Sequence, residues 1–202
     1  MNARLVACAV ASLLAAAPLA AQVPGSSGRP ISIVFSGGAT VPTGSFKEYH
    51  DFGFHGDVSV LLRLFGAGIR LRPEITYGRF SVKDAIQSAL KGIGSTGTAN
   101  AAYSSADVST LLGAFGNIEF PLVGGLYLLG GVGAVGLSSE VTTSATPLSE
   151  TKLSYNGGAG LRFKIGGISG FVEGRLANLA VEKGAALFKD VKTIPVSFGL
   201  VF

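Results

Sequence analysis

Cysteine is nearly absent from this sequence. Cys8 is the only one among 202 residues, and it lies inside an apolar run at the N-terminus. A lipid-anchoring cysteine would follow such a run, so we do not assign a lipoprotein. Once an N-terminal export signal is removed, no cysteine remains, and the fold must depend on hydrogen bonding and packing instead of disulfides.

Long hydrophobic runs and charge are also scarce. After residue 21 there is no stretch of about 18 or more apolar residues, so we expect no transmembrane helix. Only 14% of the residues are charged, whereas 48% are hydrophobic. A chain this apolar without a helical span is typical of a transmembrane β-barrel. Its 30 glycines disfavour helices and suit turns and crowded barrel interiors.

Motifs for cofactors, metals and nucleic acid are missing as well. The formal net charge is +4, but the basic residues form neither a run nor a patch with aromatic residues. The glycine pairs follow strands and turns and do not precede a helix, and no cluster of metal-ligating residues occurs. We therefore expect no cofactor, no metal and no nucleic-acid partner.

The N-terminus has a targeting pattern. Residues 1–21 begin with a basic residue, continue with an apolar run and end on small residues, which is the layout of a secretory signal peptide cut after Ala21. The run is too short for a membrane anchor. Residues 22–30, rich in Pro, Gly and Ser, are expected to form a periplasmic tail, and 31–202 the barrel domain.

Alternation of apolar and polar residues predicts eight strands. Successive side chains of a strand point to opposite faces, so a strand between two environments shows a period of two. The clearest case places Arg70, Arg72 and Glu74 on one face, opposite apolar and ring side chains. In 126–138 nearly every residue is apolar or glycine, and its faces cannot be assigned. The predicted strands lie at about 31–40, 53–65, 69–77, 106–120, 126–138, 151–165, 168–178 and 194–202.

The connections between these strands alternate in length. The long ones are expected at 41–52, 81–105, 139–150 and 179–192, and the short ones at 66–68, 121–125 and 166–167. Outer-membrane barrels have short periplasmic turns and longer extracellular loops. A soluble barrel of the lipocalin type would show the same alternation along each strand, but its apolar face would point inward and its polar face would point to water. The export signal, the connection lengths and the low charge favour an all-β fold, a transmembrane eight-stranded antiparallel up-and-down β-barrel.

The last predicted strand has the pattern of a barrel-assembly signal. Its alternate positions are all apolar and it stops on an aromatic residue: Ile194, Val196, Phe198, Leu200 and Phe202. We expect it to pair with 31–40, because unpaired backbone groups are not tolerated in lipid.

With these features in place, the chain resembles the small eight-stranded outer-membrane barrels of the OmpA/OmpX class. The resemblance rests on the N-terminal signal, the segment Ile31-Ser-Ile-Val-Phe-Ser-Gly-Gly-Ala-Thr-Val-Pro-Thr-Gly-Ser-Phe46, the strand rhythm and the Phe202 tail. These are features of a class and not a functional motif. We do not expect the C-terminal peptidoglycan-binding domain of the fuller OmpA pattern.

Charged residues on the expected inner faces have two interpretations. The interior of an eight-stranded barrel is just wide enough for side chains to fill, so the first is a plug of ion pairs. The second is a narrow anion-favouring path, since basic residues outnumber acidic ones. The nine residues are Arg63, Arg70, Arg72, Glu74, Glu119, Arg162, Lys164, Glu173 and Arg175.

Small residues on the inner faces leave a third hypothesis open. They lie beyond the charged layer, close to Leu111 and Phe115. A small cavity open to the outside and able to take an apolar ligand would follow from them. The small residues are Ser59, Gly113, Gly158, Gly160, Ser197 and Gly199.

The two histidines allow an enzyme hypothesis. His50 and His55 are expected in or beside the first long loop, together with Ser45, Glu48 and Asp51. Some eight-stranded barrels that resemble this one act on lipid A with histidine and serine or aspartate, and such a set has the chemistry of a nucleophile, a base and an orienting acid. The spacing matches no motif, so we expect a solvated loop and no enzyme.

The sequence therefore predicts an integral outer-membrane protein, monomeric, with a structural or surface-interaction role through the loops at 81–105 and 139–150. Its expected partners are outer-membrane lipid and lipopolysaccharide, and the barrel-assembly machinery during insertion. The alternatives are a barrel enzyme acting on outer-membrane lipid, a narrow channel, and a binder of small apolar ligands.

Overall fold

The protein is described by a computed structural model that covers residues 30–64, 68–84, 106–141, 149–165, 168–179 and 191–202. The predicted signal peptide and all of the predicted tail except Pro30 lie outside the described residues. Within the described ranges, no helix has the length and apolar character needed to cross a membrane.

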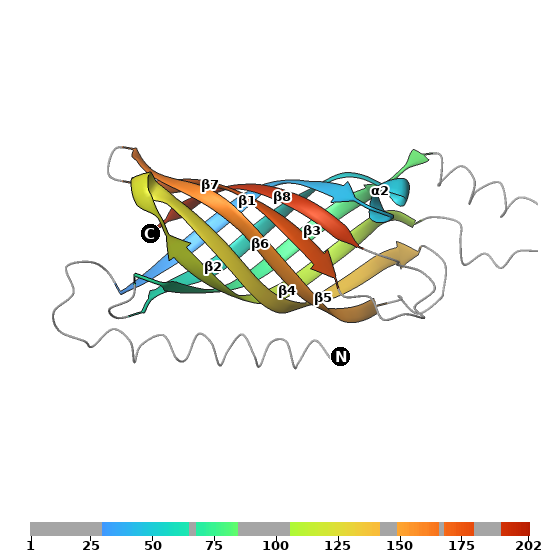
Figure 1. Cartoon of the computed structure of the whole chain (residues 1–202). Coiled ribbons are helices and arrows are strands. Elements are labelled where there is room, and N and C mark those ends of the chain that lie inside the picture. Colours follow the sequence, from blue (N-terminus) through green and yellow to red (C-terminus); the bar gives the residue numbers. More distant parts are fainter. Residues whose placement is uncertain (1–29, 65–67, 85–105, 142–148, 166–167, 180–190) are drawn as a thin grey trace, which may run out of the picture.

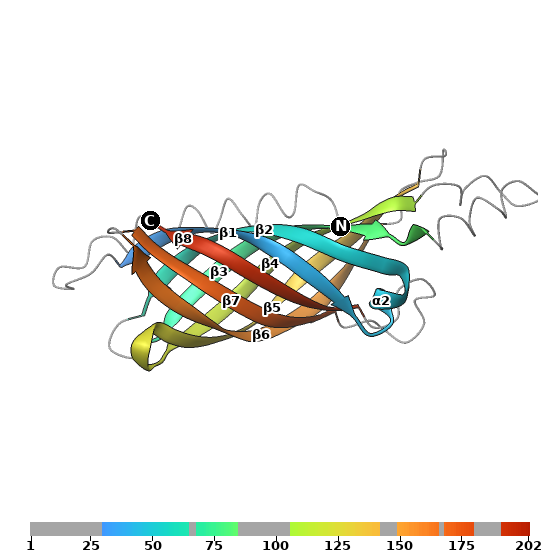
Figure 2. The ribbon, with the colours of Figure 1, turned by 90° about the horizontal axis from the view of Figure 1, so that it is seen from above.

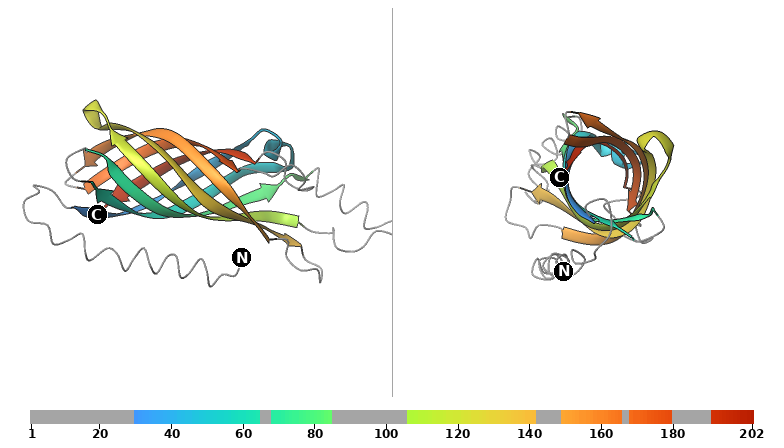
Figure 3. Two further views of the ribbon diagram at one scale, coloured as in Figure 1. Left: turned by 60° about the horizontal axis from the view of Figure 1, so that its bottom comes forward. Right: turned by 90° about the vertical axis from the view of Figure 1, so that its left-hand side faces the viewer.

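Eight strands form one closed antiparallel sheet in which each strand pairs with its neighbour in sequence (Figures 1 and 3). This confirms the predicted eight-stranded up-and-down barrel. The elements are β1 (Ile31–Thr43), α2 (Phe46–Tyr49), β2 (His50–Arg63), β3 (Arg70–Val82), β4 (Ala106–Pro121), η3 (Val123–Gly125), β5 (Leu126–Val141), β6 (Ser149–Ile165), β7 (Ile168–Leu179) and β8 (Lys192–Val201).

The barrel closes between its first and last strands, as predicted. The β1–β8 register runs from the pair Val34 and Val201 to the pair Thr43 and Lys192. The pairing continues past β8, because the N–H of Phe202 donates to the carbonyl of Ile33 at 2.9 Å. The returning N–H of Ile33 donates to the Phe202 carbonyl at 3.1 Å. Closure leaves no sheet edge with unpaired backbone groups.

The two ends of the barrel differ in their connections. The end we call the turn end carries 64–69, 122–125 and 166–167, and also the end of β8. The opposite loop end carries 44–49, 83–105, 142–148 and 180–191. Figure 2 shows α2 at the loop end, opposite the C-terminal end of β8.

The first connection of the loop end is shorter than predicted. We expected a loop at 41–52, but β1 continues to Thr43 and β2 begins at His50. The polar residues of this stretch suggested a solvated loop, whereas one of them, His50, is a buried residue at the start of β2. A polar side chain that faces a polar barrel interior has the same sequence signature as one in a loop.

The outer surface of the barrel is an apolar belt. Aromatic residues lie at both rims, with Phe54, Tyr77 and Tyr155 toward the loop end and Phe120 toward the turn end. Such a belt with aromatic rims is what lipid requires of a spanning sheet. The exposed apolar side chains of the strands include Ile33, Phe35, Phe54, Val58, Ile75, Tyr77, Leu112, Ile118, Phe120, Leu128, Val132, Leu153, Tyr155, Leu161, Val172, Leu176, Val196 and Phe198.

Phe80 is an aromatic residue of β3 that does not belong to the outer belt. Its side chain is buried inside the barrel, at 2% exposure, whereas Tyr77 is exposed outside. Period two explains the result, because Phe80 has the same parity as the inward Arg72 and Glu74, whereas Tyr77 has the opposite parity.

Two apolar clusters fill the interior near its two ends. The cluster toward the turn end contains Val34, Leu61, Tyr127, Leu129 and Phe171. The cluster toward the loop end contains Phe46, Phe80, Val135 and Val191. The faces of β5, which the sequence could not assign, are now clear, since Tyr127, Leu129, Val135 and Leu137 are buried inside and Leu128 and Val132 are exposed outside.

Candidate functional site

The structure brings together seven of the nine charged residues predicted to face the interior. They form two ion-pair groups, one near the turn end and one in the middle of the barrel. Arg63 and Lys164 do not join them, because both side chains are exposed at the turn end. The seven are Arg70, Arg72, Glu74, Glu119, Arg162, Glu173 and Arg175.

The group near the turn end is one carboxylate held by two arginines. Nη1 of Arg70 lies 2.7 Å from Oε1 of Glu119, and Nη2 of Arg162 lies 2.6 Å from Oε2. The Glu119 side chain is completely buried, while those of the two arginines are about one-fifth exposed. The group therefore carries one net positive charge and shows its cationic side toward the turn end.

The middle group contains two arginines and two glutamates and has no net charge. Glu173 lies 2.8 Å from Nη1 of Arg72 and 2.5 Å from Nε of Arg175, and it also accepts a 2.6 Å hydrogen bond from the Tyr127 hydroxyl. Both terminal nitrogens of Arg175 donate to Glu74, at 2.5 and 2.7 Å. Nη2 of Arg72 has no hydrogen-bond partner among the described residues, but it lies 3.3 Å from Oε2 of Glu74, so its charge is paired within the group.

Aromatic rings complete the middle of the interior. The guanidinium of Arg72 lies 5.0 Å from the ring centroid of Phe171, and that of Arg162 lies 5.1 Å from the ring centroid of Tyr127. Such cation–π contacts add stabilisation where water is excluded.

Two described cavities lie in the lumen, one toward each end, and no residue lines both.

The strongest partners of the charged residues escaped sequence reasoning. Tyr127 was not predicted to be inside, because β5 shows no alternation, and Phe171 was not singled out although it has the same parity as the inward Glu173 and Arg175. Asn117 and Asn156 also meet across the barrel, where Nδ2 of Asn156 donates to Oδ1 of Asn117 at 2.9 Å. A lone tyrosine in a glycine-rich strand was the available signal, since a buried hydroxyl needs a partner.

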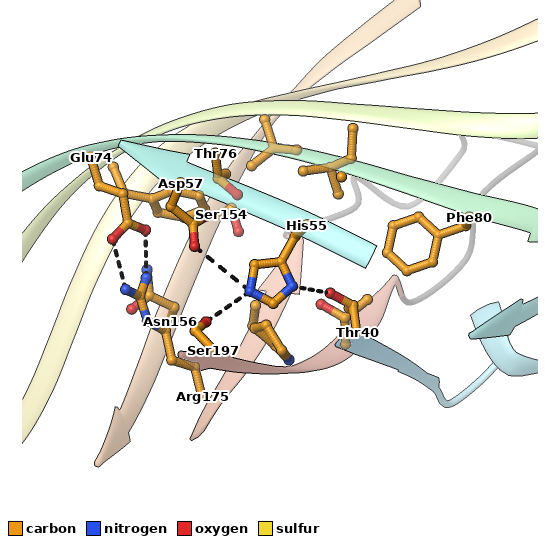
Figure 4. A pocket seen from close by; sticks show the side chains of 17 residues that line it. Thr40, His55, Asp57, Glu74, Thr76, Phe80, Ser154, Asn156, Arg175 and Ser197 are labelled. Atoms are coloured by element: carbon orange, nitrogen blue, oxygen red, sulfur yellow. Dashed lines mark hydrogen bonds and ion pairs between the residues drawn. The ribbon is translucent and has the colours of Figure 1, made fainter. Parts of the chain in front are cut away.

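The cavity toward the loop end has a polar floor and an apolar wall (Figure 4). Asp57, Glu74 and Arg175 lie at one side and Phe80 at the other, and Leu111 also lines the cavity. Its volume is about 60 Å³, well below the roughly 300–1,000 Å³ of ordinary small-molecule sites. It has room for ordered water more than for an apolar ligand.

Small inner-face residues do not open this cavity as we expected. Leu111, Phe115 and Ser197 line it, but the other small residues that motivated the hypothesis do not. Large neighbouring side chains occupy the space beside them. A Cβ on Gly160 would meet the Tyr127 ring, and one on Gly199 would meet the Phe171 ring.

Both histidines are buried, which corrects the prediction of a solvated loop. His50 stacks on Phe46 and lies 2.8 Å from Oγ of Ser109, at the loop end of the interior. His55 lies deeper, with Nδ1 2.7 Å from Oγ1 of Thr40. None of the loop residues that we grouped with them in the sequence contributes a side-chain hydrogen bond to either ring among the described contacts.

The surroundings of His55 do not have the geometry of a nucleophilic triad (Figure 4). Nε2 of His55 lies 2.7 Å from Oγ of Ser197 and 3.6 Å from Oδ2 of Asp57. In a triad the carboxylate holds the other ring nitrogen, which orients the base toward the nucleophile. Here that nitrogen bonds Thr40, so His55 joins a buried polar network.

A metal centre has no basis in the described residues, in which no three potential ligands among His, Cys, Asp and Glu come together. The arrangement is that of a filled barrel, with paired charges in the middle, an apolar cluster toward each end and a basic mouth at the turn end.

Comparison with known proteins shows what fold this is. No family model matches the sequence, and no curated protein matches it. Among solved structures, Neisserial surface protein A matches with a TM-score of 0.53 and 15% identity over 85% of this chain and 96% of that chain. The Yersinia pestis outer membrane protein Ail in a phospholipid bilayer nanodisc matches with a TM-score of 0.51 and 14% identity, over 86% and 99%.

A crystal structure of the same Ail protein, in complex with the heparin analogue sucrose octasulfate, matches with a TM-score of 0.50 and 13% identity, over 85% and 96% of the two chains. At such identities the likeness concerns the fold. The chain has the fold of the small eight-stranded outer-membrane β-barrels.

Proposed function

We propose that this protein is an integral outer-membrane protein whose barrel is a closed anchor and whose role is structural or surface-interacting. The observation that carries the proposal is the placement of apolar and charged residues, which is the reverse of that in a soluble barrel. The outer surface of this protein is apolar, and seven charged residues of its strands are paired inside it. A soluble barrel would have the reverse arrangement, because water would meet its outer face.

The expected setting follows from this arrangement. The turn end faces the periplasm and the loop end the exterior, as in barrels of this architecture. The partners we propose are outer-membrane lipid and lipopolysaccharide around the belt, and the barrel-assembly machinery during insertion. The fold likeness to Ail in a bilayer nanodisc supports contact with lipid. We propose a monomer, because the ion pairs and both apolar clusters are complete within one chain.

A channel is disfavoured by the interior. The middle ion-pair group spans the lumen from β3 to β7, and Tyr127 and Phe171 pack against it from the turn end. Anions would have to displace buried salt bridges to pass. An enzyme is disfavoured by the geometry around His55, whose two ring nitrogens are engaged by Thr40 and Ser197.

Membrane insertion is tested with the refolded protein. Unheated samples should migrate differently from boiled samples on a denaturing gel, and the native protein should fractionate with the outer membrane. Identical mobility together with a soluble periplasmic protein would overturn the proposal. In planar bilayers we expect no stepwise conductance, and reproducible single-channel steps would replace the closed anchor with a channel.

The role is tested in a strain that lacks the protein. If the role is structural, the strain that lacks the protein should be sensitive to detergent. A barrel whose segment 85–105 is replaced with a short Gly/Ser linker should then restore its resistance. A surface-interaction role predicts that only the full chain restores the wild-type phenotype. Equal mobility shifts of both barrels would show that the trimmed variant has folded, so a missing rescue would report on the loop.

A further inference from the structure

The mouth of the barrel at the turn end is a basic vestibule. Its cavity has a volume of about 610 Å³, which lies within the roughly 300–1,000 Å³ of small-molecule sites. Four of its lining residues are cationic, and none is acidic. The cationic residues are Arg63, Arg70, Arg162 and Lys164.

Among the described side chains, the carboxylate that offsets these four charges is that of Glu119. Glu119 lies behind the vestibule wall and pairs with both Arg70 and Arg162, which leaves an excess of three positive charges. Arg63 and Lys164 are exposed, and neither has an ion-pair partner among the described residues. The Nε of Arg162 is buried without a hydrogen-bond partner in the described part of the chain.

The excess is local to this end of the molecule. The three connections of the turn end, 64–69, 122–125 and 166–167, contain neither Asp nor Glu in their sequences. Connections of the loop end carry both signs, as in Lys47 and Glu48. A field of one sign in a cleft with low-dielectric walls concentrates ions of the opposite sign.

The inner end of the vestibule is closed. Leu61, which lines it, belongs to the apolar cluster that contains Tyr127 and Phe171, and Val201, which also lines it, packs against that cluster. Arg162 also stacks on Tyr127, which holds its guanidinium at the wall. An anion can therefore enter from the turn end and bind there, but it has no path through the lumen.

We propose that this vestibule binds a phosphate-bearing anion. Guanidinium groups match the oxygens of phosphates in a fork-like geometry, and Lys164 adds a point charge. An excess of three charges favours a multivalent phosphate over a single carboxylate. Two sources supply this chemistry at the periplasmic side, a soluble phosphate compound and the headgroup of an inner-leaflet phospholipid. The periplasmic placement rests on the proposed function; the binding itself does not.

Pyrophosphate tests the soluble source. The full barrel is refolded into nanodiscs of zwitterionic phosphatidylcholine, and binding is measured by calorimetry at low salt. We expect saturable one-to-one binding, which the R63Q/K164Q double variant weakens at least about tenfold. The matched control is R79Q, which removes an exposed, outward-facing arginine near the loop end and should bind like the wild type. Heat-modifiable mobility verifies that each variant has folded.

Nanodiscs that contain phosphatidylglycerol test the lipid source. If the anion is a lipid headgroup, this lipid should change the NMR signals of the arginine side chains at the mouth in the wild type but not in R63Q/K164Q. Pyrophosphate should then not bind. The inference is overturned if the wild type binds neither pyrophosphate nor the phosphatidylglycerol headgroup. It is also overturned if R63Q/K164Q binds as tightly as the wild type, or if R79Q loses as much binding as R63Q/K164Q. A folded barrel without anion binding would leave the proposed function intact.

Discussion

Glu173 is the residue whose loss should damage the barrel most. Its side chain is 1% exposed and accepts contacts from Arg72, Arg175 and the Tyr127 hydroxyl. In E173Q the shape is kept, but two buried arginines are left with Glu74 as their only carboxylate. The new amide also points donors toward groups that are themselves donors.

The expected cost follows from the uncompensated charge. Breaking a buried pair by removing one partner costs about 3–5 kcal/mol, so E173Q should raise the unfolding equilibrium constant by about two to four orders of magnitude. The assay is urea unfolding of the barrel in lipid vesicles, followed by gel mobility and circular dichroism, because the sequence has no tryptophan to report by fluorescence.

Two further variants separate charge from packing. K164Q removes an exposed charge at the turn end and should change the free energy of unfolding by no more than about 0.5 kcal/mol. R72M/E173L removes the whole pair, and because an apolar replacement leaves no unpaired charge, it should be less destabilised than E173Q. An E173Q barrel within about 1 kcal/mol of the wild type would refute the assignment of a dry, tightly coupled interior.

Three other substitutions, one of them with a matched control, test the packing, the orientation and the closure of the barrel. Leucine at Gly160 would collide with the buried ring of Tyr127, so G160L should lower the urea midpoint of folded protein in vesicles. Lysine at Val132, an exposed position of β5, should cost about 2–4 kcal/mol in a bilayer by urea titration, whereas V123K in the turn should cost little. F202A removes a ring that packs edge-on against the ring of Phe35, with 6.1 Å between the two ring centroids. We therefore expect a smaller folded fraction in timed refolding assays.

Each of these has a result that would contradict it. A G160L barrel as stable as the wild type would mean that Tyr127 has space to move. Equal effects of V132K and V123K would mean that the outer face does not meet lipid. Unchanged refolding of F202A would show that backbone pairing alone closes the sheet.

The sequence predicted well wherever alternation was visible. Strands such as β3 and β8 carry one apolar and one polar or small face, and period two then fixes which residues point inward. It failed in β5, where glycine and apolar residues occupy both faces, so that Tyr127 and its bond to Glu173 stayed hidden. It also mistook the ends of β1 and β2, residues 41–43 and 50–52, for a loop, because His50 is a polar residue buried inside the barrel.

Contacts across the lumen were beyond the sequence, because they depend on distance in the closed sheet and not on spacing in the chain. Arg72 and Glu173 are 101 positions apart and meet only after β3 and β7 face each other across the barrel. The sequence by itself determined the number, direction and facing of most strands, since each is a local alternation. Only the tertiary structure decided that the interior is filled and charge-paired in the middle and left basic at one mouth, because burial and pairing arise when the eight strands close.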